Sequence, residues 1–326
     1  MRLKKVALRG GKESLAVYHR GGWRALAPFA ELGEARFDLL AFLTGGDEMQ
    51  ARVAALLEET EREEETLAEP AAEALLPFEP TSFRDFMLYE EHAVNATRGW
   101  LKRFMPRAYR IVSIFERVSG RPHAKVRPSA LWYQRPIYYL GNARAFLTEG
   151  AEVPWPGYTA ALDYELELGF VLARPLRDAD PAEALAAIGA FFVLNDYSAR
   201  DVQAAEMRSG FGPVKAKNFA TGIGAEVVTA DEVLPGWQQL RGRIKLDGET
   251  VCEGAAAGPH FDLGEAVAYA SQGEPLEAGA VLATGTFPGC SALENEQWLR
   301  PGAVVTAEID GVGGLTQRIG SPPAKP

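Results

Sequence analysis

Cysteine and long apolar runs are scarce in this chain of 326 residues. Its two cysteines, Cys252 and Cys290, are too few for a disulfide-dense framework or a zinc ribbon. No run approaches the roughly 18 to 20 apolar residues that a membrane-spanning helix needs. The basic start of the chain, Met1–Lys5, is followed by no apolar segment of the signal-peptide kind. We therefore expect a cytoplasmic protein with no membrane partner.

An excess of positive charge is also missing. Lysine and arginine total 34 against 44 aspartate and glutamate residues, for a formal net charge of −10 and a pI near 5.1. Non-specific binding to nucleic acids or anionic membranes needs clustered Lys and Arg, so neither partner is expected. No glycine-rich nucleotide fingerprint opens a helix after a strand, which disfavours a nucleotide-dependent enzyme. The remaining composition, 47% hydrophobic and 24% charged, predicts one or two domains with a sizeable core.

Residues 1–78 have the pattern of a small β-module with one helix. Short apolar runs at 6–9, 14–18 and 23–26 are separated by glycine pairs, which is typical of strands joined by turns. Apolar residues at helical spacing after Asp47 predict a helix, and the acidic residues 58–65 are interpreted as a solvated helix face without function. Pro70 and the segment Pro77–Pro80 predict a linker. We therefore expect a module at 1–78 and a second domain at 79–326.

The second domain is organised around Asp163–Phe170, in which acidic and apolar residues alternate. In a strand this spacing places Glu165 and Glu167 on one face and the residues between and around them on the other. If the apolar face packs into a core, the two carboxylates repel each other, and a divalent cation would relieve the repulsion. An exposed sheet face with acidic side chains in water remains the alternative on this segment alone.

Two further segments add groups to this hypothetical site. The apolar run Phe191–Leu194 predicts a buried strand, and Asp196 follows it after Asn195, where an unpaired carboxylate is costly. With Glu165 and Glu167 it would make an oxygen-rich site for magnesium, calcium or manganese. The loop at 210–222 carries Lys215 and Lys217, and such a loop can place an ammonium group beside an anionic substrate or a metal site. A solvated lysine loop is the alternative.

Helices and hairpins are predicted around these strands. Ser82 is a candidate cap of a helix on which Asp85 and His92, seven residues apart, share one face. A lone histidine is more often a surface or core residue than a catalytic one. Asp180-Pro181 opens another helix whose apolar side includes Ile188 and which Gly189 ends. We also expect a helix at 261–271, a buried strand at 280–286, and hairpin turns at Asp247-Gly248 and Asp310-Gly311.

Taken together, the motifs resemble the fumarylacetoacetate hydrolase family, in its longer form with a small N-terminal module. The resemblance covers about Phe83 to Ile319 and is strongest in Asn195-Asp196-Tyr197-Ser198-Ala199-Arg200-Asp201 with the preceding Glu-x-Glu. The other ordered pieces are Asp85-Phe86, His92-Ala93 with Asn95, Tyr139 before Gly141, Gln203, Lys217–Thr221, and Thr284-Gly285-Thr286. It implies a β-rich α+β fold, a mixed β-sandwich or β-roll with flanking helices, and a homodimer.

Roles follow position by position from the resemblance. It implies that Asp85, Glu165, Glu167 and Asp196 bind a divalent metal, magnesium first and manganese or calcium as alternatives. His92 matches a general base, and its glutamate partner matches Glu294, with Glu296 in reserve because the intervening stretch is gapped. Lys217 matches a residue that stabilises negative charge. Substrate contacts are implied for Tyr139, Gln203 and Thr286.

These roles describe a hydrolase that cleaves a carbon–carbon bond in a small 1,3-diketo acid or acylpyruvate. Two positions depart from the fumarylacetoacetase pattern: Met87 and Met207 stand where those members carry tyrosine. The loss of two hydroxyls predicts an acyl group larger or less polar than fumaryl. A hydratase, an isomerase or a 2-oxoacid decarboxylase of the same fold is the alternative, and a non-enzymatic metal-binding module is a third.

Overall fold

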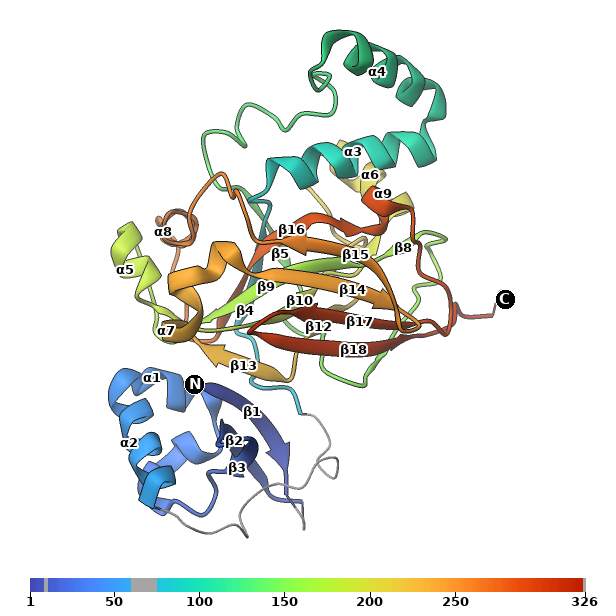
Figure 1. The fold of residues 1–326 in the computed structure, drawn as a ribbon. Coiled ribbons are helices and arrows are strands. Elements are labelled where there is room, and N and C mark those ends of the chain that lie inside the picture. Colours follow the sequence, from blue (N-terminus) through green and yellow to red (C-terminus); the bar gives the residue numbers. More distant parts are fainter. Residues whose placement is uncertain (9–10, 60–74, 325–326) are drawn as a thin grey trace.

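The computed structural model describes residues 1–8, 11–59 and 75–324. Within these ranges an 11-stranded sheet packs against a five-stranded sheet, and helices lie around both (Figure 1). This arrangement confirms the predicted β-rich α+β class. In the part of the chain that the structure describes, no helix is long and apolar enough to cross a membrane.

The large sheet has the order β3-β2-β1-β13-β10-β9-β16-β4-β5, and β12 and β6 continue from β10. Its strands are β1 (Arg2–Ala7), β2 (Glu13–His19), β3 (Gly22–Ala25), β4 (Ser82–Phe86), β5 (Tyr138–Gly141), β6 (Phe146–Leu147), β9 (Glu165–Leu172), β10 (Ile188–Asn195), β12 (Thr221–Ile223), β13 (Glu226–Thr229) and β16 (Ala280–Ser291). The second sheet has the order β15-β14-β17-β18-β7. It contains β7 (Glu152–Val153), β14 (Arg241–Leu246), β15 (Glu249–Ala255), β17 (Val304–Ile309) and β18 (Gly313–Ile319), and β8 (Leu162–Asp163) pairs separately with β11 (Ser198–Ala199).

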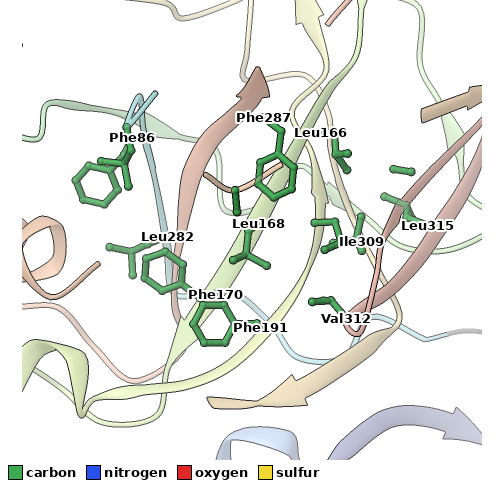
Figure 2. Packing of buried hydrophobic residues seen from close by; sticks show 14 of the residues in the cluster. Phe86, Leu166, Leu168, Phe170, Phe191, Leu282, Phe287, Ile309, Val312 and Leu315 are labelled. Atoms are coloured by element: carbon green, nitrogen blue, oxygen red, sulfur yellow. The ribbon is translucent and has the colours of Figure 1, made fainter. Parts of the chain in front are cut away.

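The main core lies between the two sheets. Leu166 and Leu168 of β9 are fully buried there with residues of the second sheet such as Ile309 and Leu315, as Figure 2 shows. Burial of this apolar surface is the main stabilising contribution to the sandwich. The strand therefore presents its apolar side to the sandwich core, as the alternation at 163–170 predicts, and its glutamates to the opposite face of the large sheet.

That opposite face has a core of its own. Phe192 and Leu194 of β10 belong to it, whereas Phe191 and Val193 of the same strand face the sandwich. Helices α1 (Leu39–Thr44) and α2 (Gly46–Glu59) contribute Phe42 and Val53 to this second core. Because β9 and β10 are buried on both faces, any charged group placed on them must find a partner inside the protein.

The N-terminal strands continue the large sheet. Strand β1 pairs antiparallel with β13 through Leu3 and Val227, and β2 and β3 extend the sheet outward. The helix predicted after Asp47 is α2. The division at residue 78 remains a prediction, and Pro70 with the acidic residues at 60–65 lies outside the described residues.

Two helix predictions are wrong. Asp85 lies on strand β4 rather than on a helix with His92, because β4 pairs with both β16 and β5 and buries Phe83 and Phe86. The helix begins only at Glu90, as α3 (Glu90–Phe104), followed by α4 (Pro106–Ser119). Pairing with distant strands has overridden the local capping signal at Ser82.

The second concerns residues 180–189, where the predicted start of the helix is confirmed and its predicted end is wrong. Asp180 caps α5 (Pro181–Leu185) with a full capping box, but the helix ends before Ile188. Ile188 and Gly189 belong to β10 instead. A Cβ on Gly189 would lie 2.8 Å from the Cβ of Ala173, so this glycine serves close strand packing rather than helix termination.

The hairpin predictions are confirmed. Asp247 and Gly248, both at positive φ, connect β14 to β15, and Asp310-Gly311 lies between β17 and β18. Asp262 caps α8 (Leu263–Ser271), and β16 contains the buried strand predicted at 280–286. The remaining helical segments are α6 (Arg200–Arg208), α7 (Ala230–Val233), α9 (Ala292–Asn295) and the 3-10 segments at Ala30–Arg36 and Leu234–Gln239.

Candidate active site

Three buried carboxylates meet on the face of the large sheet that is turned away from the five-stranded sheet. Asp85 comes from β4, Glu167 from β9, and Asp196 from the residue directly after β10. The strand register brings Asp85 and Glu167 close together, because β4 and β9 both pair with β16. Glu167 lies opposite Thr286 of β16, and Asp85 lies opposite Ala283, three residues earlier on the same strand. One oxygen from each carboxylate lies within 4.8 Å of the other two. The predicted convergence of Asp85, Glu167 and Asp196 is therefore present.

Each of these carboxylates keeps an oxygen without a protein partner. Asp85 Oδ1, Glu167 Oε2 and Asp196 Oδ1 are buried and accept no hydrogen bond from the described residues. Burial, reinforced by the neighbouring carboxylates, raises the pKa of Asp85 and of Glu167 well above the ordinary range. Burial also raises the pKa of Asp196 despite the nearby Lys217 ammonium. Partnerless buried oxygens in a crowded acidic cluster fit a hard divalent cation.

Glu165 differs from these three groups because cations of the protein already surround it. The Arg200 guanidinium and the Lys217 ammonium pair with opposite oxygens of its carboxylate. Although burial opposes the charged form, these two cations hold the pKa of Glu165 well below its ordinary value. Glu165 is thus an ionised neighbour of the three-carboxylate cluster, and its role as a metal ligand remains a prediction.

Lys217 is the buried member of the lysine loop. Its Nζ pairs with both Glu165 and Asp196, and its side chain is almost fully buried, whereas Lys215 is exposed. Burial by itself would lower the pKa of Lys217, but the Asp196 and Glu165 carboxylates outweigh it and raise that pKa. A fixed positive charge therefore stands inside the site. The alternative of a fully solvated lysine loop applies only to Lys215.

His92 and Glu294 form a buried pair beside these groups. Nδ1 of His92, on α3, lies 2.8 Å from Oε2 of Glu294, on α9. Nε2 of the same ring lies 3.6 Å from Oε1 of Glu165. Because an ionised carboxylate can only accept, the contact with Glu294 favours the tautomer with the proton on Nδ1 and leaves the Nε2 lone pair available. The predicted pairing of these two residues is present, and Glu296 pairs with Lys102 at the surface instead.

The segment before α9 holds Glu294 in place. The backbone N–H of Gly289 donates to Oε1 at 3.0 Å, and the Ser291 hydroxyl donates to Oε2 at 2.9 Å. Together with His92, these donors occupy both oxygens of a carboxylate that is nearly inaccessible to solvent. They fix the orientation of the acceptor and hence that of the imidazole ring.

Replacing Ser291 by Ala is expected to lower the free energy of unfolding by about 1 kcal/mol, because a buried acceptor loses one of its donors. Chemical denaturation of wild type and variant measures the change. Ser113→Ala on α4, where the exposed hydroxyl bonds to the carbonyl of Arg110, is the matched control, with an expected change within about 0.5 kcal/mol. Equal effects of the two substitutions would show that the Ser291 hydroxyl does not support Glu294.

Two predicted substrate contacts bond to the acidic cluster. The Tyr139 hydroxyl donates to Asp196 Oδ2 at 2.8 Å, and the Thr286 hydroxyl donates to Glu167 Oε1 at 3.2 Å. The side-chain oxygen of Gln203, on α6, accepts a hydrogen bond from Arg200 Nη1 at 2.9 Å. The amide NH₂ group of Gln203 takes no part in that bond. Met87 and Met207 are 42% and 54% exposed, so the departures from the fumarylacetoacetase pattern leave accessible apolar side chains.

Sequence reasoning missed Asp163 and Arg200 as site residues. Both are buried, and Arg200 joins Asp163 Oδ2 at 2.7 Å to Glu165. Asp163 also accepts from the backbone N–H groups of Ala292 and Leu293, where α9 begins. These contacts connect the acidic cluster to the helix that carries Glu294. The alternating segment did carry a signal for Asp163, because Asp163 is its third acidic residue, at the same two-residue spacing as Glu165 and Glu167.

The family model described as fumarylacetoacetate (FAA) hydrolase C-terminal matches residues 113–320, which include Glu165, Asp196 and Glu294 but not Asp85 or His92. Oxaloacetate tautomerase FAHD1, mitochondrial, of Homo sapiens is 28% identical over 201 residues, which are 61% of this chain and 87% of that protein.

Solved structures extend the similarity of fold to the N-terminal residues. A fumarylacetoacetate hydrolase from psychrophilic Exiguobacterium antarcticum has a TM-score of 0.69 at 20% identity, over 98% of this chain and 99% of that one. Maleylpyruvate hydrolase from Sphingobium sp. SYK-6 has a TM-score of 0.67 at 16% identity, with the same coverage. At these identities the structures show a shared fold and no more.

Proposed function

Because this chain belongs to the fumarylacetoacetate hydrolase family, we propose that it is a metal-dependent hydrolase that cleaves a carbon–carbon bond in a 1,3-diketo acid or acylpyruvate. The observation that carries the proposal is the His92–Glu294 pair beside three buried carboxylates with partnerless oxygens. A buried base with a fixed tautomer is what activation of water requires, and a structural ion site has no need of one.

Asp85, Glu167 and Asp196 would hold the metal, with Glu165 as the fourth ligand proposed from the family resemblance. Magnesium is the first choice for an all-oxygen ligand set, with manganese and calcium as alternatives. When bound, such an ion acts as a Lewis acid toward the oxygens of a 1,3-dicarbonyl group.

His92 supplies the base. With Nδ1 hydrogen-bonded to Glu294, its Nε2 takes a proton from water, and the resulting hydroxide attacks the acyl carbonyl carbon. The bond between that carbon and the adjacent methylene then breaks, and its electron pair passes to the pyruvate part as an enolate. Protonation of the enolate carbon completes the reaction: one acylpyruvate and one water give one carboxylic acid and one pyruvate.

Lys217 stabilises the negative charge that develops during these steps. Its ammonium group is buried between Glu165 and Asp196 and is held in the charged form by both. A preorganised charge in a water-excluded site interacts more strongly with an alkoxide or enolate than an exposed one does.

Tyr139, Gln203 and Thr286 are proposed to contact the substrate at the edge of the acidic cluster. Near them, the exposed side chains of Met87 and Met207 support an acyl group that is less polar than fumaryl. An acylpyruvate with an apolar acyl chain is therefore the preferred substrate class.

A tautomerase or isomerase is the second candidate, because the human relative is named an oxaloacetate tautomerase. Such a reaction needs enolate stabilisation by Lys217 and the metal but incorporates no water. The reaction products also distinguish a hydratase or a 2-oxoacid decarboxylase of the same fold from the hydrolase. A non-enzymatic ion-binding module would turn over none of these compounds.

Product analysis in ¹⁸O-labelled water tests the proposal. Purified protein with magnesium is incubated with acylpyruvates of increasing chain length and with oxaloacetate, and products are identified by mass spectrometry. A hydrolase releases a carboxylic acid carrying one ¹⁸O together with pyruvate. Enol–keto exchange without acid release would instead establish the tautomerase, and loss of carbon dioxide the decarboxylase.

Tyr139→Phe is expected to weaken magnesium binding about fivefold, which corresponds to the loss of one hydrogen bond of about 1 kcal/mol. That hydrogen bond lowers the pKa of Asp196, so its removal makes protons compete better with the ion. The loss should therefore be larger at pH 6 than at pH 8. Isothermal titration calorimetry at both pH values measures it, with Tyr158→Phe, whose hydroxyl bonds to the carbonyl of Lys215, as control.

We further propose a cytoplasmic homodimer that binds no nucleic acid. Light scattering coupled to size-exclusion chromatography gives the subunit count directly. A monomer that retains full activity would contradict the dimer without affecting the proposed reaction.

A further inference from the structure

The two cysteines lie next to each other on neighbouring strands. Cys252 is on β15 and Cys290 is on β16, 38 residues apart in the sequence, and their Sγ atoms are 2.9 Å apart as free thiols. Gly254 lets the strands approach, since a Cβ there would lie 2.8 Å from Cys290 Sγ. The pairing is therefore a feature of how β15 packs on β16.

We propose that Cys252 and Cys290 form an oxidation site, a dithiol that a peroxide converts to an intramolecular disulfide. A disulfide has an S–S length of about 2.05 Å, so closure needs the sulfurs to approach by roughly 0.9 Å from their present separation. Movements of this size are available to side chains without separating the strands. The ligand class of the site is a small hydroperoxide, which can reach the half-buried Cys252 more easily than a bulky disulfide can.

The chemistry assigns different parts to the two thiols. Cys252 is half-buried and Cys290 is buried, so a peroxide reaches Cys252 first; the contact with Cys252, together with burial, also raises the pKa of the Cys290 thiol. Cys252, as thiolate, attacks one peroxide oxygen; the O–O bond breaks, and the departing hydroxide takes up a proton to become water. Cys290 sulfur then attacks the Cys252 sulfenic acid, the S–O bond breaks, and a second water leaves with the Cys290 proton. Two thiols are oxidised and one hydrogen peroxide is reduced to two waters.

Cys290 lies between two residues that hold Glu294. Its neighbours Gly289 and Ser291 donate the hydrogen bonds to the two Glu294 oxygens, and Asn295 donates to the carbonyl of Gly289. Displacing Cys290 toward Cys252 shifts these donors and thus the partner of His92. Disulfide formation is therefore expected to lower the activity of the site, and this second step rests on the proposed function.

Oxidation itself is tested without any substrate. Full-length protein treated with hydrogen peroxide should lose about 2 Da, yield a cross-linked peptide containing Cys252 and Cys290, and regain two titratable thiols with dithiothreitol. Cys252→Ser should abolish the cross-link, and Cys252→Ala repeats the test if the serine variant does not fold. Stable gain of about 16 or 32 Da on Cys252, or a dimer on non-reducing gels, would overturn the proposal.

The coupling to the site is tested separately. Oxidised wild type should show at least tenfold lower kcat with unchanged magnesium affinity and should recover on reduction, while Cys252→Ser keeps full activity in peroxide. A disulfide that forms but leaves kcat unchanged would overturn the coupling. If no substrate is turned over even by the reduced protein, the proposed function fails, whereas the mass measurement still decides whether the disulfide forms.

Discussion

Replacing His92 by Asn is expected to lower kcat by about 10³-fold, within the range of roughly 10² to 10⁴ for the loss of a general base. The asparagine amide can still donate to Glu294, but no basic nitrogen remains at the position of Nε2. Steady-state kinetics on the substrate identified by product analysis measures the loss.

The controls separate a base from a structural role. Metal affinity and the unfolding midpoint of His92→Asn should stay close to wild type, since His92 contributes none of the partnerless oxygens. His123→Gln, in the segment after α4, removes another imidazole, whose ring contacts Phe115 and Lys125 rather than a site residue, and should leave kcat unchanged. An unchanged kcat in His92→Asn would exclude its role as the base and favour an ion site that needs no water activation.

The alternation of the sequence predicted the arrangement of β9 because the side-chain period of a strand is a local property. Glu165 and Glu167 face one side and Leu166 and Leu168 the other, and the apolar side packs as expected. The hairpins at Asp247-Gly248 and Asp310-Gly311 were predictable for the same reason, since a short hairpin loop is specified by the residues within it, two residues in the first case and three, with Val312, in the second.

The placement of Asp85 could not be predicted from local signals. Ser82 begins a segment with the composition of a capped helix, yet the pairing partners of β4 are Ala280–Ala283 and Tyr138–Gly141, far away in the sequence. The same limit applies to Asp163 and Arg200, whose importance depends on a contact across 37 residues. It applies equally to Cys252 and Cys290, which composition shows only as two isolated thiols.

Glu167→Gln is expected to change stability in opposite directions with and without metal. At a free-ion concentration of about 100 times Kd, a bound ion stabilises the wild type by about 2.7 kcal/mol. The variant should lose most of this gain, because it removes one of the three partnerless carboxylates. In chelator the same substitution should stabilise the protein, because it removes a charge from a cluster in which burial and repulsion already raise the pKa values of Asp85 and Glu167.

The pH dependence gives a second measure of the same repulsion. Since the pKa of Glu167 is raised in the folded protein, the folded state binds a proton more tightly than the unfolded chain, whose glutamates titrate near 4.5. Stability from this group is therefore fully present below about pH 4.5 and is lost as pH rises through the raised pKa. In chelator, the difference in unfolding free energy between Glu167→Gln and wild type should grow as pH rises.

Glu249→Gln, at an exposed acid on β15, controls for the change in net charge. A metal-independent loss of stability in Glu167→Gln would mean that the Glu167 carboxylate supports the fold and does not hold an ion.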